Sequence, residues 1–479
     1  MNLSRCPGRS GPAARLLVLS AAMLLGACAA TTAPSSTDPA APAIPGAWSV
    51  PTTGSATVPT PVDWWQRFND PALAELVDRA LKANPNLRSA QAALAQARAQ
   101  RAVQEASNGP SVGGSLSAQR SQNGNADAGN RFQAGFDASW EPDVFGGNRA
   151  ALDASDANVR AAQTGLADVQ VSLAAEVAAG LIELRGLQSR RDIAQRNLAA
   201  QTETLQITRW RVQAGLASSL DLEQAVAAHA QTQSQIPALQ TSLGQSRNAL
   251  AVLTGAAPGA LDTLLDRTAP IPTAPATLAL SLPADTLRQR PDVRTAEHRI
   301  SAALANVAAA DAARYPSFRL GGSLGLSSIT LGALTDGASV LRSLLASVSI
   351  PLLDGGAARA RVQAQEAALE QARATYASTV LSALKDVENA LVAIRGDQER
   401  LARLQVAAEA AVNAELLARQ RYQSGLIDFR TVLDTQRSLL SAQDSVAAAQ
   451  ASLATDHVRL YKALGGGWTP DTPDNAAAR

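Results

Sequence analysis

The sequence repeats itself after about 210 residues, and this duplication constrains the fold more than any other feature. Four short segments recur in the same order in the second half of the chain. The pairs are Asn84-Pro85-Asn86-Leu87-Arg88 with Arg290-Pro291-Asp292-Val293-Arg294, Gly113-Gly114-Ser115-Leu116-Ser117 with Gly321-Gly322-Ser323-Leu324-Gly325, Phe145-Gly146-Gly147 with Asp354-Gly355-Gly356, and Arg211-Val212-Gln213-Ala214-Gly215-Leu216 with Arg421-Tyr422-Gln423-Ser424-Gly425-Leu426. Each copy must supply the same structural part, and the function must tolerate pseudo-symmetry. Duplication does not favour a single asymmetric active site.

The first 28 residues have the pattern of a targeting signal that ends at a lipidated cysteine. Arginines precede a short apolar stretch at residues 16–25, which is too short to span a bilayer with ease. The stretch ends in Leu25-Gly26-Ala27-Cys28, which resembles the bacterial lipoprotein signal, and Ala29 points to the outer membrane in such signals. We expect residues 1–27 to be a signal peptide and Cys28 to carry the lipid, palmitate included. The alternative is an ordinary signal peptide with a chance cysteine.

Composition excludes several function classes. The 42 basic and 41 acidic residues give no basic surface for nucleic acid. Cleavage before Cys28 leaves one cysteine, so neither an intrachain disulfide nor a thiolate metal cluster can form. The three histidines, His229, His298 and His457, lack zinc-ligand spacing and are expected on solvated helix surfaces. We expect no cofactor and no metal. Aromatic residues make up only 3%, which suits long, closely packed helices.

Two pairs of segments alternate between apolar and polar side chains with a period of two. They cover residues 111–119 and 132–141 in the first copy, and 318–327 and 343–350 in the second, with Leu345 as an exception. Segments of about ten residues with one apolar face are typical of a transmembrane β-barrel whose apolar face meets lipid. The alternative is a half-buried strand of a soluble sandwich.

Helical patterns fill most of the remaining chain. Residues 148–214 and 357–424 lack proline and repeat apolar residues at intervals of three and four, which predicts two rods of about 100 Å in a coiled-coil-like assembly. Gly215 and Gly425 end the rods, and return helices are expected at 219–254 and 429–464. Shorter helices are expected at 71–83 and 85–107, the first of them capped by Asp70.

These elements predict an ordered plan for the mature chain. Residues 28–62, rich in Pro, Ala, Thr and Ser, are expected to form an extended tether. The first repeat covers 63–265 and the second 290–467. The segment 266–289 is expected to link them, and 468–479 to form a tail.

Four strands cannot close a barrel, and open strand edges find no hydrogen-bond partners in hydrocarbon. Several chains must therefore pool their strands. Two chains would give a barrel filled by side chains, whereas three would leave a lumen. The small polar residues on one strand face favour three. We therefore predict an α+β membrane protein, a homotrimer in which a long helical barrel is continuous with a β-barrel built from four strands per chain.

The chain resembles the TolC-like outer-membrane efflux factors, most closely their lipoprotein branch of the OprM and NodT type. The resemblance covers nearly all of the mature chain. It is carried by Asp63-Trp64-Trp65 with Phe68 and Asp70-Pro71, Asn84-Pro85-Asn86-Leu87, Trp140-Glu141-Pro142-Asp143-Val144-Phe145-Gly146, Arg290-Pro291-Asp292-Val293, Ile350-Pro351-Leu352-Leu353-Asp354-Gly355-Gly356, Tyr422-Gln423-Ser424-Gly425 and Val432-Leu433-Asp434-Thr435-Gln436. It implies a trimeric channel-tunnel that exports small molecules such as drugs and toxic compounds. Its partners would be a periplasmic adaptor and a proton-driven inner-membrane pump of the resistance-nodulation-division type.

Two other functions stay open at this point. The same tunnel could export proteins in type I secretion, or the chain could be a structural coiled-coil lipoprotein of the envelope. The amphipathic strands count against the second, because a tether needs no barrel. No nucleophile–base set or phosphate loop indicates an enzyme.

The resemblance also implies a gate at the periplasmic tip, near the Gly215 and Gly425 turns. The matching positions are Tyr422 and Asp221 for a tie between neighbouring helices, and Asp434 for a ring of carboxylates, with Arg437 one turn on. Ile427 and Arg430 depart from the family's pattern, which leaves the locking contacts open. The alternative for Asp221, Asp434 and Arg437 is ordinary solvated helix charge.

Overall fold

The computed structural model describes residues 44–49, 62–122, 124–125, 127–274 and 283–469. The predicted signal peptide, Cys28 and most of the predicted tether lie outside these residues.

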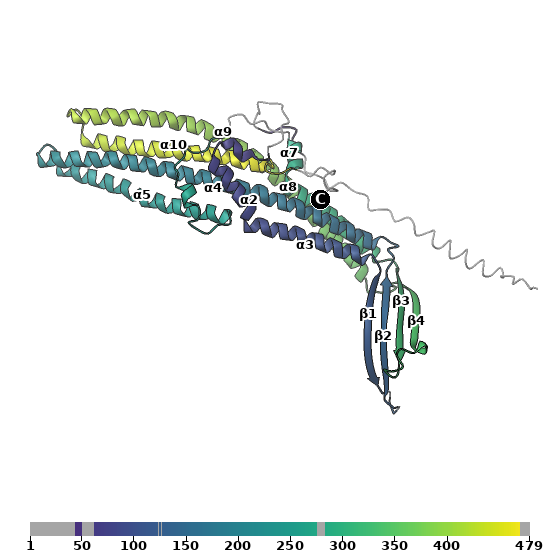
Figure 1. The fold of residues 1–479 in the computed structure, drawn as a ribbon. Helices are drawn as coiled ribbons and strands as arrows, with labels where there is room; N and C mark the ends of the chain where they lie inside the picture. Colours follow the sequence, from purple (N-terminus) through teal and green to yellow (C-terminus); the bar gives the residue numbers. More distant parts are fainter. Residues whose placement is uncertain (1–43, 50–61, 123, 126, 275–282, 470–479) are drawn as a thin grey trace, which may run out of the picture. The chain divides into compact units, whose positions relative to one another are not determined.

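The helices and strands are shown in Figure 1. In chain order they are η1 (Trp64–Phe68), α2 (Pro71–Ala83), α3 (Pro85–Ser107), β1 (Ser111–Ser121), β2 (Gly129–Trp140), α4 (Gly147–Gln213), α5 (Ser219–Leu253), α6 (Asp262–Leu265), α7 (Pro283–Gln289), α8 (Pro291–Ala312), β3 (Ser317–Ser328), η2 (Gly337–Ser339), β4 (Val340–Ser349), α9 (Ala357–Gln423) and α10 (Phe429–Ala463). The predicted strands and long helices are confirmed.

The two 67-residue helices, α4 and α9, organise the helical part, and each is about 100 Å long. Toward the strands they alternate with α3 and α8, in the order α3, α4, α8, α9. Toward their other ends they alternate with the return helices, in the order α5, α4, α10, α9. Four helices therefore lie side by side at either end of the rods. A stretch of α4 is long and apolar enough to cross a membrane, but half of it is buried inside the protein, as in a core helix.

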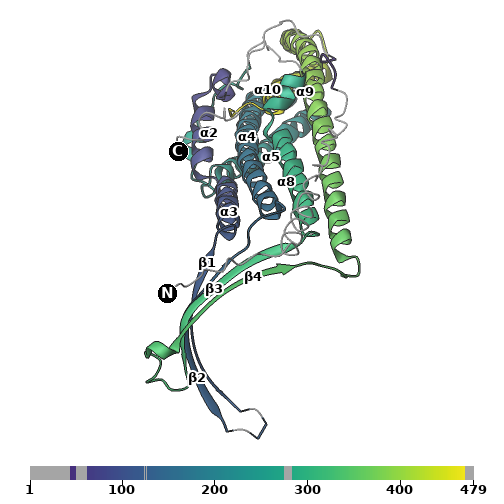
Figure 2. The same cartoon turned by 90° about the vertical axis from the view of Figure 1, so that its right-hand side faces the viewer.

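The four strands form one antiparallel sheet in the order β1-β2-β3-β4 (Figure 2), so the hairpins of the two repeats pair through β2 and β3. Val112, Leu116, Phe136, Leu324 and Leu344 share one face, and the other face is mostly Ser, Gly, Gln and Asp. The predicted two-faced pattern is confirmed. The register adds two exceptions in β4: Arg342 lies on the apolar face opposite Leu324, and Leu341 joins Leu345 on the polar face.

The strands β2 and β3 approach closely where Gly135 pairs with Gly325. These residues face each other on the polar side of the sheet. A Cβ atom at Gly325 would lie 2.7 Å from the Ala134 carbonyl oxygen, and one at Gly135 would lie 3.0 Å from the Gly325 Cα. No side chain fits between the two backbones, so this glycine pair lets the strands close toward the polar face.

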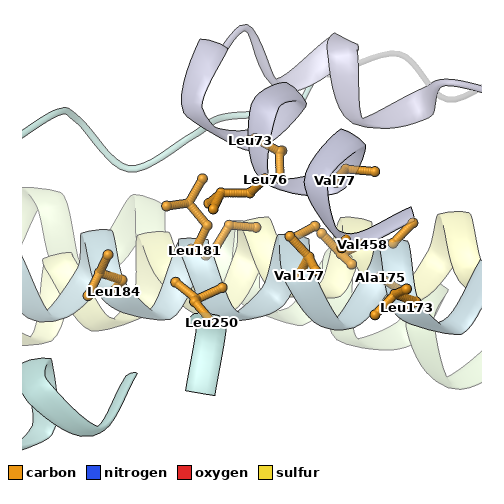
Figure 3. Close-up of a cluster of buried hydrophobic side chains, with 14 of the residues drawn as sticks. Leu73, Leu76, Val77, Leu173, Ala175, Val177, Leu181, Leu184, Leu250 and Val458 are labelled. Carbon is orange, nitrogen blue, oxygen red and sulfur yellow. The ribbon is translucent and has the colours of Figure 1, made fainter. Parts of the chain in front are cut away.

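A large apolar core joins η1 and α2 to one side of α4. Leu73, Leu76 and Val77 of α2 pack against Val177 and Leu181 of α4, as Figure 3 shows. The Trp64 ring stacks on Tyr461 of α10 with 5.2 Å between centroids. Next to this core along α4, the Arg185 side chain is buried. It donates to Gln188 Oε1 at 2.9 Å and to the Arg267 carbonyl oxygen, and its Nε lies 3.7 Å from the Asp70 carboxylate. We call η1, α2 and α6 the belt.

Each repeat contains the same junction, in which the residue before an early helix contacts the end of the last helix of that repeat. Asn84 Nδ2 donates to the Leu253 carbonyl oxygen at the end of α5, and Arg290 donates to the Ala463 carbonyl oxygen at the end of α10. The glycine two residues after each acceptor, Gly255 or Gly465, has a positive φ and packs against the backbone that precedes the partner proline. The duplication seen in the sequence is therefore also a duplicated set of long-range contacts.

One expectation is wrong, that of a solvated His457, and the structure adds detail to the segments predicted as linker, tail and tether. His457 is buried at 3% exposure because α10 packs between α4 and α9, whereas His229 and His298 are partly exposed. The predicted linker contains α7, and Trp468 of the predicted tail donates to the Gln289 carbonyl oxygen. Residues 44–49 of the predicted tether contact α9, where the Ser49 amide donates to Glu388 at 2.9 Å.

Candidate channel gate at the distal helix turns

Two helix turns with the same backbone lie at the ends of α4 and α9 that point away from the strands (Figure 1). Gly215 and Gly425 have φ of +68° and +72°, the left-handed conformation that ends a helix. The Leu216 amide donates to the Arg211 carbonyl oxygen at 2.7 Å, and the Leu426 amide to that of Arg421 at 2.9 Å. The repeated sequence therefore builds the same turn twice.

Different side chains cap the helices that follow. Ser218 and Asp221 form a capping box at the start of α5, in which the Asp221 carboxylate accepts from the Ser218 amide at 3.1 Å and from its hydroxyl at 2.9 Å. Asp428 caps α10, and bonds from the Thr431 hydroxyl and amide lower the pKa of its carboxyl. Asp221 thus has a local role in this chain.

Tyr422 is the half-buried centre of the tip. Its ring lies 4.5 Å from the Arg211 guanidinium and 5.4 Å from the Phe429 ring, and it contacts the apolar cluster formed by Leu205, Ala225, Ala228, Phe429 and Leu433. Burial raises the pKa of the Tyr422 hydroxyl, Arg211 opposes this, and the Asp221 carboxylate adds to it. The structure therefore brings Tyr422 and Asp221 into one electrostatic neighbourhood. Within the described residues Asp221 bonds to Ser218 instead of Tyr422.

Asp434 lies on the exposed side of α10, away from Val432, Leu433 and Gln436, which are buried. Its carboxylate is 3.8 Å from Arg430 Nε and 3.7 Å from Arg437, and its side chain is 57% exposed. The departure at Arg430 therefore gives Asp434 a second cation. Ile427 is partly buried in the turn.

A cavity of about 350 Å³ beside Tyr422 contains residues that the sequence did not single out. It is lined by Glu203, Thr204, Ile207, Arg211, Leu216, Arg419, Tyr422, Gln423 and Val432. Arg419 makes paired hydrogen bonds of 3.2 Å to Glu415, which is buried. The four-residue spacing of Glu415 and Arg419 is a signal for such a pair. The contact of Arg211 with Tyr422 joins different repeats, so no local pattern indicates it.

The family model of outer membrane efflux proteins matches residues 76–256 and 282–466, one segment in each repeat. The chain belongs to this family. The pyoverdine export outer membrane protein OpmQ of Pseudomonas putida is 34% identical over 471 residues, which cover 96% of this chain and 98% of OpmQ. Outer membrane protein OprJ of Pseudomonas aeruginosa is 30% identical, with 95% of this chain and 96% of OprJ covered.

Solved structures of the family share this fold. The outer-membrane channel OprN superposes with a TM-score of 0.83 at 35% identity, covering 89% of this chain and 98% of OprN. The open state of the Neisseria gonorrhoeae MtrE outer membrane channel gives a TM-score of 0.77 at 27% identity, covering 89% of this chain and 98% of MtrE. As an outer membrane efflux protein, the chain is a channel component in the outer membrane and not an enzyme.

Proposed function

We propose that three copies of this chain form one channel, with a twelve-stranded β-barrel in the outer membrane and twelve helices around a periplasmic lumen. The observation that carries this proposal is the four-stranded sheet, whose outer strands β1 and β4 have no partner on their free edges within the described residues. Such edges are not tolerated in hydrocarbon unless neighbouring chains pair with them. The side-by-side arrangement of four helices at either end of the rods suits the same threefold repetition.

The two faces of the sheet give its orientation in this barrel. The face with Phe136, Leu324 and Leu344 would meet lipid, and the polar face would line the lumen. The close approach at Gly135 and Gly325 supports this orientation, because two residues without side chains on the polar face leave room for the sheet to curve toward that face.

A matched pair of substitutions in β2 tests the barrel. Phe136→Asp would place a charge in lipid and cost on the order of 2 kcal/mol per chain, so the trimer should be lost. Asp137→Ala changes the neighbouring lumen residue and should leave the trimer intact. Light scattering of the detergent-solubilised protein measures the mass, and planar bilayers measure conductance. A wild-type protein that stays folded as a monomer would refute the pooled barrel.

The cargo is proposed to be small molecules handed over by a periplasmic adaptor and an inner-membrane pump of the resistance-nodulation-division type. Relatives named for pyoverdine export and for solvent and toluene efflux support small-molecule cargo. Crosslinking in intact cells followed by purification should recover one adaptor and one such pump. Recovery of a protein-secretion ATPase in their place would favour type I secretion.

Lipidation at Cys28 is proposed from Leu25-Gly26-Ala27-Cys28. The intact mass of the mature protein should correspond to a start at Cys28 with acyl chains added. Cys28→Ser should still form the trimer, because the strands and not the lipid span the membrane. A mature protein that starts elsewhere would contradict the proposal.

The tip is proposed to be the gate. Support comes from the Tyr422 cluster, which joins α9 and α10 to α4 and α5, and from Asp434 on the exposed side of α10. These contacts are few and partly exposed, so a docked adaptor could shift the tip between closed and open states.

A further inference from the structure

A groove of about 910 Å³ runs along the middle of α4, between α5 and α10. Its lining on α4 includes Glu176, Gly180, Glu183 and Leu187, which recur at intervals of three and four residues and so lie on one helix face. The opposite face of α4 carries Arg185, which contacts Asp70 at the start of α2 and the Arg267 carbonyl oxygen after α6. The groove is therefore turned away from these contacts with the belt.

The floor of the groove is apolar because the helices approach closely. A Cβ atom at Gly180 would lie 3.0 Å from the Leu250 side chain of α5, and one at Gly186 would lie 3.0 Å from the Ala451 Cβ of α10. Leu187 and Val252 add larger apolar surface, and Val252 is 62% exposed. A hydrophobic body of limited size can lie on such a floor.

The charges of the groove are unbalanced. Arg190 is paired with Asp444 by hydrogen bonds of 2.7 and 3.1 Å, and Arg459 with the buried Asp456 at 2.8 Å. Glu176 and Glu183 have no ion pair or hydrogen bond within the part of the chain that the structure describes. They stand two helical turns apart, about 10 Å, above the apolar floor. The groove therefore combines apolar surface with two uncompensated carboxylates.

We propose that this groove binds lipophilic monocations, with the apolar body on the Gly180 floor and the positive charge between Glu176 and Glu183. Charge complementarity selects this class, because an anion would meet two carboxylates and the nearby arginines are already paired. A place on the export path rests on the proposed channel function. Binding itself does not, and can be measured on the purified protein.

Tetraphenylphosphonium and tetraphenylborate are suitable probes because they have the same shape and opposite charges. Equilibrium dialysis against the purified full-length protein should show the cation bound at least tenfold more tightly than the anion. Glu176→Gln with Glu183→Gln should weaken cation binding about tenfold, and added salt should weaken it in the wild type. Val252→Ser should weaken binding of the cation about threefold through lost apolar contact.

The control is Glu366→Gln with Glu409→Gln, which removes the same charge from exposed positions of α9 outside the groove and should leave binding unchanged. Equal binding of both probes, or an unaltered cation affinity in the Glu176 and Glu183 double variant, would overturn the proposal. Conductance of the same preparations separates it from the channel function. A conducting protein that does not bind the cation contradicts only the groove, and a protein that binds it without conducting contradicts only the channel.

Discussion

Arg185 shows how one buried cation can hold the belt against α4. Its guanidinium lies among Asp70 at the start of α2, Gln188 of α4 and the Arg267 carbonyl oxygen after α6, and its side chain is 3% exposed. Gln188 in turn donates to the Leu265 carbonyl oxygen at 2.8 Å. Three segments distant in sequence therefore depend on one side chain.

We expect Arg185→Ala to destabilise the protein by about 3–5 kcal/mol, because it leaves a buried carboxylate and a buried carbonyl without their partner. Thermal unfolding of the detergent-solubilised protein, followed by circular dichroism, measures the effect. Arg79→Ala is the control, since Arg79 pairs with Glu75 on the exposed side of α2 and should contribute less than about 1 kcal/mol. Equal melting temperatures of the two variants would contradict a role for Arg185 in holding the belt.

His457 makes stability depend on pH. Burial lowers the pKa of its imidazole, and its Nδ1 has no hydrogen-bond partner in the described residues. Above the unfolded pKa of about 6.5 the imidazole is neutral in both states, so it adds no pH dependence. Below that pH the unfolded chain binds a proton that the folded protein resists, and the folded state loses stability down to the folded pKa.

We therefore expect His457→Gln to remove part of the fall in melting temperature between pH 7.5 and pH 5. His229→Gln is the control, because His229 is partly exposed and lies 3.1 Å from the Thr202 hydroxyl. Melting curves of the three proteins over this pH range give the answer. If the melting temperatures of the wild type and of His457→Gln fall equally with pH, protonation of His457 does not contribute to the loss of stability.

The sequence could not have revealed either residue. Arg185 and His457 lie in helical stretches where polar side chains usually meet solvent, and the sequence interpretation placed His457 there. Their burial depends on which helices pack against which face of α4 and α10. Asp70 was predicted correctly as a cap, because its hydrogen bond to the Ala72 amide is local.

At the scale of elements, Gly135 and Gly325 allow the backbones of β2 and β3 to approach closely, which a curved sheet requires. Gly325→Ala would place a methyl group 2.7 Å from the Ala134 carbonyl oxygen, and no rotamer change can relieve a contact with backbone. We expect a cost of about 1–3 kcal/mol per chain and a smaller fraction of assembled trimer. Semi-native electrophoresis of unheated samples measures that fraction.

Gly321→Ala is a matched control for this prediction. Gly321 lies on the same strand and the same face, and its added methyl group would be 3.9 Å from the nearest neighbour, the Ala138 carbonyl oxygen. It should assemble like the wild type. If both variants assemble fully, the close approach of β2 and β3 is not needed for closure.

Elements with a strong periodic pattern were predictable, whereas those held by distant contacts were not. The period of two gave the four strands, and the proline-free apolar repeats between capping glycines gave α4 and α9. The short helix α7 and the contact of Ser49 with Glu388 follow no local pattern. The pairing of β2 with β3 joins different repeats, so no local pattern indicates it either.

At the scale of the whole molecule, duplication of the sequence produced two turns with the same backbone, and later divergence gave them different side chains. At the repeat offset of the turns, Val212 stands for Tyr422, Leu220 for Arg430 and Gln224 for Asp434. The backbone of both turns could therefore be predicted from the repeat, whereas the aromatic and charged side chains Tyr422, Arg430 and Asp434 occur only in the second copy. The position of these side chains relative to other chains depends on the proposed trimer.

We expect Asp221→Ala combined with Tyr422→Phe to raise single-channel conductance in planar bilayers. The double change removes a carboxylate and a hydroxyl from one neighbourhood and also the capping box of α5, which is worth about 1 kcal/mol. Ser218→Ala is the control, because it removes the hydroxyl of the box and leaves Asp221 and Tyr422 in place. If Ser218→Ala raises conductance as much as the double variant, loss of the cap and not a tie between helices opens the tip.

Ion selectivity tests whether Asp434 faces the narrowest part of the lumen. In each chain Asp434 lies between Arg430 and Arg437, so its carboxylate offsets part of their positive charge. Asp434→Asn should shift the reversal potential in a salt gradient toward anion preference, and Arg430→Gln should shift it toward cation preference, because charges near a constriction act on every passing ion. Glu223→Gln, at the exposed start of α5 in the other turn, removes a carboxylate from the tip and should change the reversal potential little.

Opposite shifts of the reversal potential in Asp434→Asn and Arg430→Gln, at unchanged trimer mass, would place α10 of all three chains around the pore. Unchanged potentials in both would show that Asp434, Arg430 and Arg437 are ordinary solvated helix charges and that the constriction lies elsewhere.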